Sequence, residues 1–266
     1  MLRKFRGALS LKKEIPTFGI KDIEPRDGMN RLRIRLANTN FYLPMVHLNF
    51  PGVVEKALGW FDPNPLVNEA LDRAATETMY QMLKKMKPKV VVMTNSTKSE
   101  NFIKEAYKRL PPGTRLVILP SGDKNAKVAE RSTDMKLVHF VPVTGTEKDM
   151  GYPKQIEGEK EYLSLEQLKE LCPDGEGLVI ADDVYTTGAT ITAMEQVLGL
   201  NEKSKHQIAV IANEKEFNGE YVPKRTPKNL HAAFILTEFV DLDKLGIDRK
   251  KLFFYDKPNI PAAIVE

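Results

Sequence analysis

Short apolar runs alternate with amphipathic segments along most of the chain. The runs have the length and composition of buried strands, and they occupy residues 90–93, 116–119, 137–143, 178–181, 208–212 and 232–236. Between them, apolar residues recur at helical spacing in residues 71–86, 102–110, 165–171 and 191–198. Strands that alternate with helices through short connections predict an α/β fold, with a mostly parallel sheet and helices on both faces.

Capping residues mark the expected ends of these helices. Asn64 with Pro65 is typical of a helix start, Ser99 can cap the second helix, and Ser164 with Gln167 forms a capping box. Gly199 is expected to stop the helix that follows residue 190. Residues 1–60 carry no long periodic segment, although residues 31–36 alternate basic and apolar residues as an amphipathic strand does.

Residues 178–190 carry the most informative pattern. The apolar run 178–181 is followed by two carboxylates, Asp182 and Asp183, where the strand is expected to end, and then by the hydroxyl-rich, glycine-containing residues 186–190. In an open α/β sheet, ligands bind beyond the carboxyl ends of the strands. The N–H groups that open the next helix suit a phosphate, and ionised carboxylates suit vicinal sugar hydroxyls, directly or through hydrated Mg²⁺. The pattern therefore indicates a site for a phosphorylated ribose.

The same stretch resembles the phosphoribosyl-pyrophosphate (PRPP) motif of type I phosphoribosyltransferases, in which apolar residues precede two acids, two variable residues and Thr/Ser-Thr-Gly-x-Thr. Ala181, usually a larger apolar residue, and Tyr185, usually aliphatic, depart mildly from it. The resemblance implies a type I phosphoribosyltransferase fold with a small hood subdomain. It also implies Mg²⁺ as the cofactor, held by Asp182 and Asp183 through water. The residues of the motif that it implies for PRPP binding are Asp182, Asp183, Thr186, Thr187, Gly188, Ala189 and Thr190.

Two further loops carry side chains that the resemblance places beside PRPP. The loop after the first core strand would hold the pyrophosphate with Asn95, Ser96, Thr97 and Lys98, although it lacks the glycine that many members have. Lys98 would be catalytic, together with Asp182 and Asp183. Lys124 and Lys127 follow the second core strand, in a segment that resembles the flexible loop that closes over the family's site. The residues themselves fit an ordinary polar loop and a solvated lysine-rich loop as well.

A looser resemblance to adenine and xanthine phosphoribosyltransferases extends over residues 64–252 and includes residues 137–143 and 232–242. It implies three parts: an N-terminal arm and hood in residues 1–63, the phosphoribosyltransferase core in residues 64–252, and a C-terminal tail in residues 253–266.

Composition narrows the class of protein. The chain has 266 residues, of which 42% are hydrophobic and 29% charged, enough for one sizeable core. Its net charge of +4 is uneven, because residues 1–35 carry +6. A solvated arm is the favoured reading of that excess, with attraction of an anionic substrate or weak nucleic-acid contact as alternatives. No apolar run is long enough for a membrane span, so we expect no membrane partner. The single cysteine, Cys172, favours a cytoplasmic location.

The sequence therefore predicts a transferase whose partners are PRPP and a nucleobase, with release of pyrophosphate; the resemblance also implies a homodimer. Some 6-oxopurine enzymes have Asp where this chain has Thr186, which argues against hypoxanthine or guanine as the base. The resemblance of residues 232–242 favours adenine or xanthine. An orotate-type enzyme and a non-catalytic PRPP-binding regulator are the alternatives.

The histidines and the C-terminal aromatic residues carry weaker signals. The four histidines show no metal-ligand spacing. The aromatic residues 253–255 could stack on a base, but a packed C-terminal core is the favoured expectation.

Overall fold

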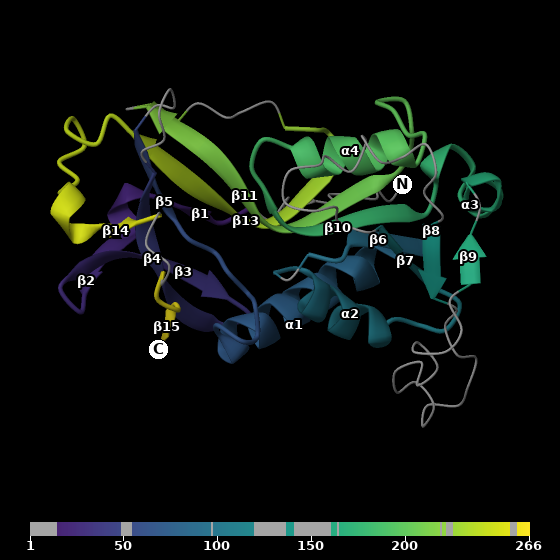
Figure 1. Ribbon diagram of the computed structural model, residues 1–266, viewed down its shortest axis with the longest axis horizontal. Helices are drawn as coiled ribbons and strands as arrows, with labels where there is room; N and C mark the ends of the chain where they lie inside the picture. Colours follow the sequence, from purple (N-terminus) through teal and green to yellow (C-terminus); the bar gives the residue numbers. More distant parts are fainter. Residues whose placement is uncertain are drawn as a thin grey trace, which may run out of the picture.

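Five parallel strands form the centre of the sheet (Figure 1). The structure is a computed structural model, which describes residues 15–48, 55–96, 98–119, 137–140, 161–163, 165–218, 220–221, 226–255 and 260–266. In order across the sheet, the central strands are β13 (Leu230–Val240), β11 (Gln207–Asn218), β10 (Leu178–Tyr185), β6 (Val90–Thr94) and β7 (Arg115–Leu119). Four of the apolar runs seen in the sequence lie entirely within strands of this group, and the run 178–181 opens β10.

The order of these strands reverses between β6 and β10. From β6 the chain continues to β7 on one side, and after β10 it continues to β11 and β13 on the other. In doubly wound sheets, the loops at such a reversal diverge to opposite faces and leave a crevice at the carboxyl ends of the two strands. The crevice between β6 and β10 is therefore where the topology favours a ligand.

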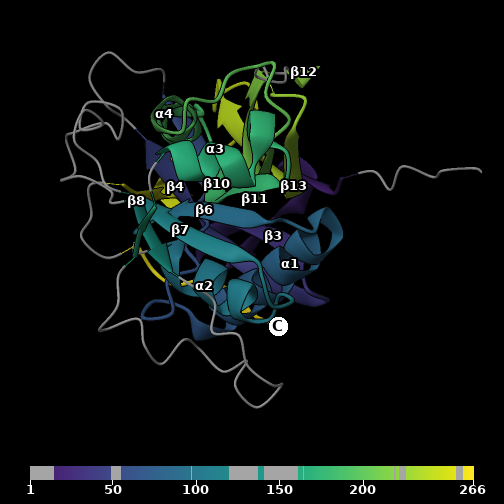
Figure 2. The ribbon, with the colours of Figure 1, turned by 90° about the vertical axis from the view of Figure 1, so that its right-hand side faces the viewer.

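Helices cover both faces of the central strands, as expected (Figure 2). α1 (Glu69–Met86) and α2 (Glu100–Lys108) pack on one face, where they bury Val91 and Met93 of β6. α3 (Leu165–Leu171) and α4 (Ala189–Val197) pack on the other face, against Val90 and Val92. This division follows from the alternation of side chains along a strand, and it places the α1–α2 layer and the α3–α4 layer on opposite sides of one sheet.

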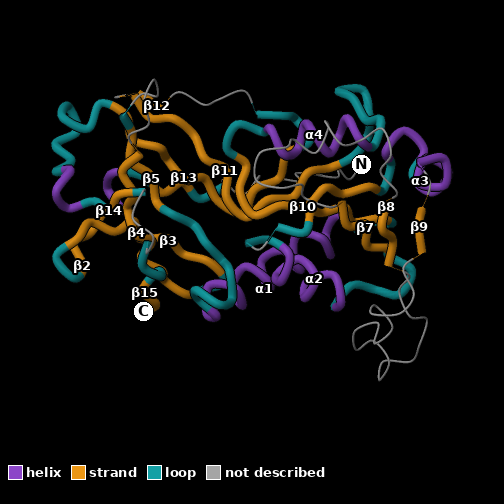
Figure 3. Tube along the Cα trace, viewed as in Figure 1, coloured by secondary structure: helices purple, strands orange, loops and turns teal. Residues whose placement is uncertain are grey.

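Antiparallel strands extend the sheet beyond β13 (Figure 3). β5 pairs with β13, β4 with β5, β3 with β4 and β2 with β3. The bounds of these strands are Lys56–Gly59 for β5, Thr39–Leu48 for β4, Met29–Leu36 for β3 and Ile23–Arg26 for β2. Near the chain ends, β1 (Thr17–Phe18) pairs with β13, whereas β14 (Phe253–Phe254) and β15 (Ile264–Val265) both pair with β4. The C-terminal residues therefore return to the N-terminal strands.

At the opposite edge, β8 (Leu137–Phe140) pairs with β7 and β9 (Glu161–Leu163) pairs with β8. The remaining short elements are β12 (Glu220–Tyr221) and the 3-10 helices η1 (Ile20–Asp22), η3 (Pro173–Gly175) and η4 (Arg249–Lys251). Among the described residues, no helix has the length and apolarity that crossing a membrane requires.

The start of α1 differs from the sequence expectation. Asn68 is the N-cap, and its Oδ1 accepts a hydrogen bond from the Leu71 amide at 3.0 Å. Asn64 instead accepts from the Leu66 amide at 3.0 Å, so Asn64 and Pro65 form a turn before the helix. Ser99 does occupy the N-cap position of α2, but its hydroxyl makes no capping hydrogen bond. The Ser164 half of the expected capping box lies outside the described residues.

Candidate functional site at the β6–β10 crevice

The two adjacent carboxylates lie within β10 and not after it. The strand continues to Tyr185, because Asp182 pairs with Val210 of β11 and Val184 pairs with Ala212. The expectation that the strand ends with the apolar run is therefore wrong, since ladder pairing with β11 persists after the apolar side chains stop. On the other side, β6 pairs with β10 only as far as Ile180. Asp182 and Asp183 thus lie where β10 runs past its β6 pairing, at the crevice.

Burial makes this pair of carboxylates electrostatically costly. Asp182 is buried, with 5% of its surface exposed, and its Oδ1 accepts a hydrogen bond from the Asp183 amide at 2.9 Å. Burial raises the pKa of Asp182 well above its usual value, and the negative charge of Asp183 raises it further. The pKa of Asp183 is also raised by burial, whereas the positive charge of Lys98 lowers it. A cation or hydrogen-bond donors from a ligand would relieve this cost.

The loop after β6 reaches the same carboxylates. Ser99 is completely buried, and its Oγ has no hydrogen-bond partner among the described residues, yet it lies close enough to Asp182 to lower the pKa of that carboxyl group. Lys98 is half-buried, acts on Asp183 electrostatically, and holds its Nζ 3.9 Å from the centroid of the Trp60 ring. Asn95 is exposed and Ser96 is half-buried. The structure therefore brings the predicted pyrophosphate loop and the predicted ribose-binding acids together.

The start of α4 forms the third part of the site. Gly188 is the N-cap, with a φ of 81°, and Ala189 is the first helical residue. The Oγ1 of Thr187 accepts a hydrogen bond from the Ala189 amide at 3.3 Å. Thr187, Ala189 and Thr190 are exposed and Thr186 is half-buried. The first amides of a helix have no acceptor inside it, so this turn offers donors to an anion from solvent.

The Tyr185 side chain packs against Gly188 in the loop between β10 and α4. A Cβ atom added at Gly188 would lie 2.4 Å from the Tyr185 hydroxyl oxygen, a distance that real Cβ atoms do not reach. A β-carbon is also strained at the positive φ of this residue. The Tyr185 side chain and Gly188 therefore fit together only because residue 188 has no side chain.

Some predicted residues cannot be placed, and some neighbours were missed. Thr97, Lys124 and Lys127 lie outside the described residues. Trp60 was not anticipated, because the residue that it contacts, Lys98, is far from it in sequence. The available signal was that Trp60 is the single tryptophan of the chain and precedes a polar turn.

Metal-ligating and nucleophilic groups are sparse in the described part of the chain. No group of three or more His, Cys, Asp or Glu residues gathers there to hold a metal ion. Cys172 is buried, and burial raises the pKa of its thiol to about 11, which suits a packed side chain and not a nucleophile.

Known proteins resemble the chain in structure only. No family model and no curated protein matches its sequence. A hypoxanthine-guanine phosphoribosyltransferase from Bacillus anthracis matches 73% of this chain and 92% of its own, with 11% identity and a TM-score of 0.33. A purine phosphoribosyltransferase from Pyrococcus horikoshii matches 63% and 86%, with 18% identity and a TM-score of 0.28. The UMP synthase of Leishmania donovani matches 77% of this chain and 35% of its own, with 14% identity and a TM-score of 0.39. The solved structures to which this chain is similar thus include phosphoribosyltransferases, the family that its motif resembles.

Proposed function

We propose that the protein is a phosphoribosyltransferase, which transfers ribose 5-phosphate from PRPP to a nucleobase nitrogen and releases pyrophosphate. One observation carries the proposal: the Asp182–Asp183 pair and Lys98 meet at the β6–β10 crevice, where the sheet order favours a ligand. PRPP has a diol, a 5′-phosphate and a diphosphate, and the crevice offers carboxylates, helix amides and an ammonium group to match them.

Each group has a distinct task in this proposal. The carboxylates of Asp182 and Asp183 accept hydrogen bonds from the ribose hydroxyls. The amides at the start of α4, with the hydroxyls of Thr187 and Thr190, bind the 5′-phosphate. Lys98 neutralises the pyrophosphate as it leaves. The reacting carbon passes through an oxocarbenium-like state, so the protein contributes mainly by positioning the reactants and stabilising charge.

Mg²⁺ suits the donor set of the crevice. Asp182 is buried and Asp183 half-buried, and both have raised pKa values, so a divalent cation would lower the cost of their ionisation. Mg²⁺ is commonly held by one or two carboxylates together with water and substrate phosphates, and this requires no cluster of three protein ligands. Asp182 and Asp183 would hold it through water, and it would neutralise the charge of the diphosphate.

A purine is the proposed acceptor, with adenine or xanthine favoured over hypoxanthine and guanine. Residue 186 argues against hypoxanthine and guanine, because it is Thr in this chain where some 6-oxopurine enzymes place Asp. Thr186 offers a hydroxyl group at this position of the loop, whereas an Asp there could act as a general base. The resemblance of residues 232–242 to adenine and xanthine phosphoribosyltransferases supports the preference for those two bases.

A PRPP-binding regulator without catalysis is the second candidate. The observation that favours it is the absence of glycine between Asn95 and Ser99, because close approach of the backbone to a diphosphate commonly needs one. In that case the protein binds PRPP through the same residues but does not release pyrophosphate.

Pyrophosphate release separates the two candidates. Purified protein is incubated with PRPP, Mg²⁺ and one base at a time, taken from adenine, xanthine, hypoxanthine, guanine and orotate. The transferase proposal predicts base-dependent release that the Asp182→Asn/Asp183→Asn double variant loses. PRPP binding without release from any base would select the regulator, and absence of both activities would refute the PRPP site.

A further inference from the structure

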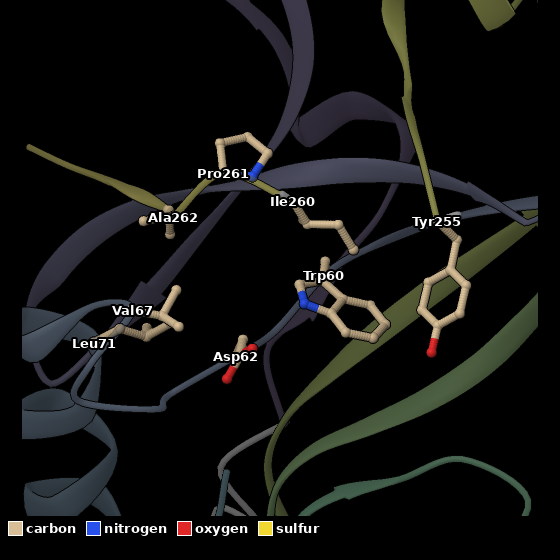
Figure 4. A pocket seen from close by; sticks show the side chains of 9 residues that line it. Trp60, Asp62, Val67, Leu71, Tyr255, Ile260, Pro261 and Ala262 are labelled. Atoms are coloured by element: carbon tan, nitrogen blue, oxygen red, sulfur yellow. The ribbon is translucent and has the colours of Figure 1, made fainter. Parts of the chain in front are cut away.

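A cavity of about 320 Å³ lies between the start of α1, the end of β5 and the C-terminal residues (Figure 4). Trp60, Tyr255 and Ile260 line one part of it, and Asp62, Val67 and Leu71 line another. Ligand cavities for small molecules begin near this volume, and a single planar heterocycle is smaller than a drug-sized ligand. The cavity therefore has room for one base.

Two aromatic rings in an edge-to-face arrangement line the cavity. The ring centroids of Trp60 and Tyr255 lie 5.3 Å apart at an interplanar angle of 63°, and Figure 4 shows the Ile260 and Tyr255 side chains next to the indole ring. Stacking of a base on aromatic side chains is favourable for every base, because each has a π face.

Trp60 also connects this cavity to the crevice. The Lys98 ammonium group lies 3.9 Å from the centroid of the Trp60 ring. The positive charge of Lys98 also lowers the pKa of Asp183. A heterocycle against Trp60 would therefore share the indole ring with Lys98, one of the groups that we assign to PRPP. An acceptor base must occupy such a place if its nitrogen is to reach the ribose carbon.

Asp62 gives the cavity a charge preference. Its Oδ1 accepts a hydrogen bond from the Asn64 amide at 3.2 Å, which fixes the carboxylate at the turn before α1. An ionised carboxylate accepts hydrogen bonds but donates none. It therefore attracts a ring that presents an N–H group and repels an anionic ring.

Residues 260–263 form the C-terminal wall of the cavity. Hydrogen bonds from β3 and from the start of α1 hold this wall in place. Arg31 donates to the Ala262 carbonyl at 3.1 Å and Asn68 donates to the Ala263 carbonyl at 2.8 Å. Beyond them, β15 pairs with β4, and the Glu266 amide donates to the Asn40 carbonyl at 3.1 Å. These hydrogen bonds preorganise the C-terminal wall in the ligand-free protein, which lowers the entropic cost of binding.

We propose that this cavity is the acceptor subsite, that it takes an uncharged nitrogen heterocycle of the purine class, and that Asp62 sets the preference for such a ring over orotate. The inference rests on the proposed function, and it adds the place of the acceptor and the residue that selects it. Trp60 and Tyr255 hold the plane of the ring, and Asp62 accepts its N–H.

Tryptophan fluorescence tests the proposal directly, because Trp60 is the single tryptophan of the chain. The full-length protein is titrated with adenine, xanthine and orotate, with and without ribose 5-phosphate, and free N-acetyltryptophanamide corrects for absorption by the bases. Saturable quenching by a purine and none by orotate is expected. Absence of quenching by either purine, or tighter binding of orotate, would overturn the proposal.

Variants assign the selectivity. Asp62→Asn keeps the Oδ1 acceptor of the turn, so the fold is expected to persist. This variant should bind purines about tenfold or more weakly, as loss of a charged hydrogen bond does. The ratio of purine affinity to orotate affinity should fall as well. Tyr255→Ala should weaken the binding of adenine and of xanthine, whereas Tyr255→Phe should not. Glu69→Gln, an equal charge change at an exposed residue beside the cavity, is the matched control. Equal effects of Asp62→Asn and Glu69→Gln would overturn the role of Asp62.

Calorimetric titration with PRPP and Mg²⁺ keeps this test separate from the proposed function. If PRPP binds but no purine quenches Trp60, the subsite is wrong and the PRPP site stands. If purines quench but PRPP does not bind, the cavity is a heterocycle site and the transferase proposal fails.

Discussion

Asp182 combines a functional position with a cost in stability. Its carboxylate is buried beside a second carboxylate, and both facts raise its pKa. Nothing in the sequence reveals this burial, because an Asp-Asp pair after an apolar run is equally compatible with an exposed loop. It arises because β10 continues past the apolar run and carries both acids into the sheet.

We predict that Asp182→Asn stabilises the ligand-free protein, by an amount that depends on pH. Because the folded-state pKa lies above the usual value of 3.8, the favourable contribution of the protonated acid is complete below about pH 4 and is lost as pH rises through the folded-state pKa. Asparagine does not ionise, so the Tm advantage of the variant should grow from pH 4 towards pH 8 in thermal melts.

Asp174→Asn is the control for this experiment. Asp174 is exposed, and asparagine tolerates its positive φ of 51°, so the Tm difference between this variant and the wild type should vary little with pH. Parallel pH curves for wild type and Asp182→Asn would contradict the burial of this acid.

Lys98 is predicted to act mainly in catalysis. Lys98→Ala removes one cation–π contact, typically worth about 0.5–1 kcal/mol at exposed sites and about 2 kcal/mol when desolvated, together with the positive charge that favours the ionised form of Asp183. Because Lys98 is half-buried, we expect a lower Tm but a folded protein. Loss of one preorganised charge contact to a developing anion should lower kcat by roughly 10²–10³-fold. Steady-state kinetics with a productive base measure this, with Lys98→Arg as the charge-preserving control. Normal turnover of Lys98→Ala would remove this loop from the site.

At the scale of elements, the centre of the sheet could be predicted and its extensions could not. The strands β6 and β7 match their apolar runs to within one residue at each end. β11 and β13 continue well past theirs, because residues 213–217 pair with residues 235–239 through backbone hydrogen bonds. That ladder has no signature in hydropathy. β4 was missed for a similar reason, since it is fixed by its partners β3 and β5 on either side.

The loop from β10 to α4 yields a prediction with a matched control. Gly188→Ala places a β-carbon at a φ of 81° and against Tyr185. Positive φ alone costs about 1 kcal/mol, or roughly 2–4 °C in Tm for a domain of this size. Displacement of Tyr185 should add to this cost and also disturb the amides at the start of α4. We expect both a lower Tm and a PRPP KM that is raised about tenfold or more.

Gly199→Ala provides the comparison at the other end of α4. Its φ is 67°, but the nearest atoms to an added Cβ belong to the Lys169 side chain at 3.6 Å. This variant should lower the Tm and leave the PRPP KM unchanged. If the two variants affect KM alike, the start of α4 does not bind the phosphate.

At the scale of the whole molecule, an ion pair joins the antiparallel strands to the parallel core. The Nζ of Lys56 in β5 lies 2.9 Å from Oε2 of Glu238 in β13, and Glu238 is completely buried. β5 and β13 pair at this point through Phe239 with Ala57 and Val240 with Lys56. The sequence could not reveal this junction, because it joins residues far apart in the chain.

Removing the cation should therefore destabilise the protein strongly. Lys56→Met leaves the Glu238 carboxylate buried without this partner, and breaking a buried pair in this way typically costs about 3–5 kcal/mol. Urea unfolding measures the loss. Arg73→Met, which breaks the exposed pair with Glu69, should cost under about 1 kcal/mol. Similar small losses in both variants would mean that the junction does not depend on this pair.

Calorimetric titration with PRPP is the most direct test of the proposed site in the β6–β10 crevice. Wild-type protein and the Asp182→Asn/Asp183→Asn double variant are titrated with PRPP in the presence of Mg²⁺, after thermal melts confirm that both are folded. We predict saturable binding of one PRPP per wild-type chain, and an affinity at least about a hundredfold lower in the double variant, because two charged contacts are removed. Equal affinities in the two proteins, or no binding to the wild type, would contradict it.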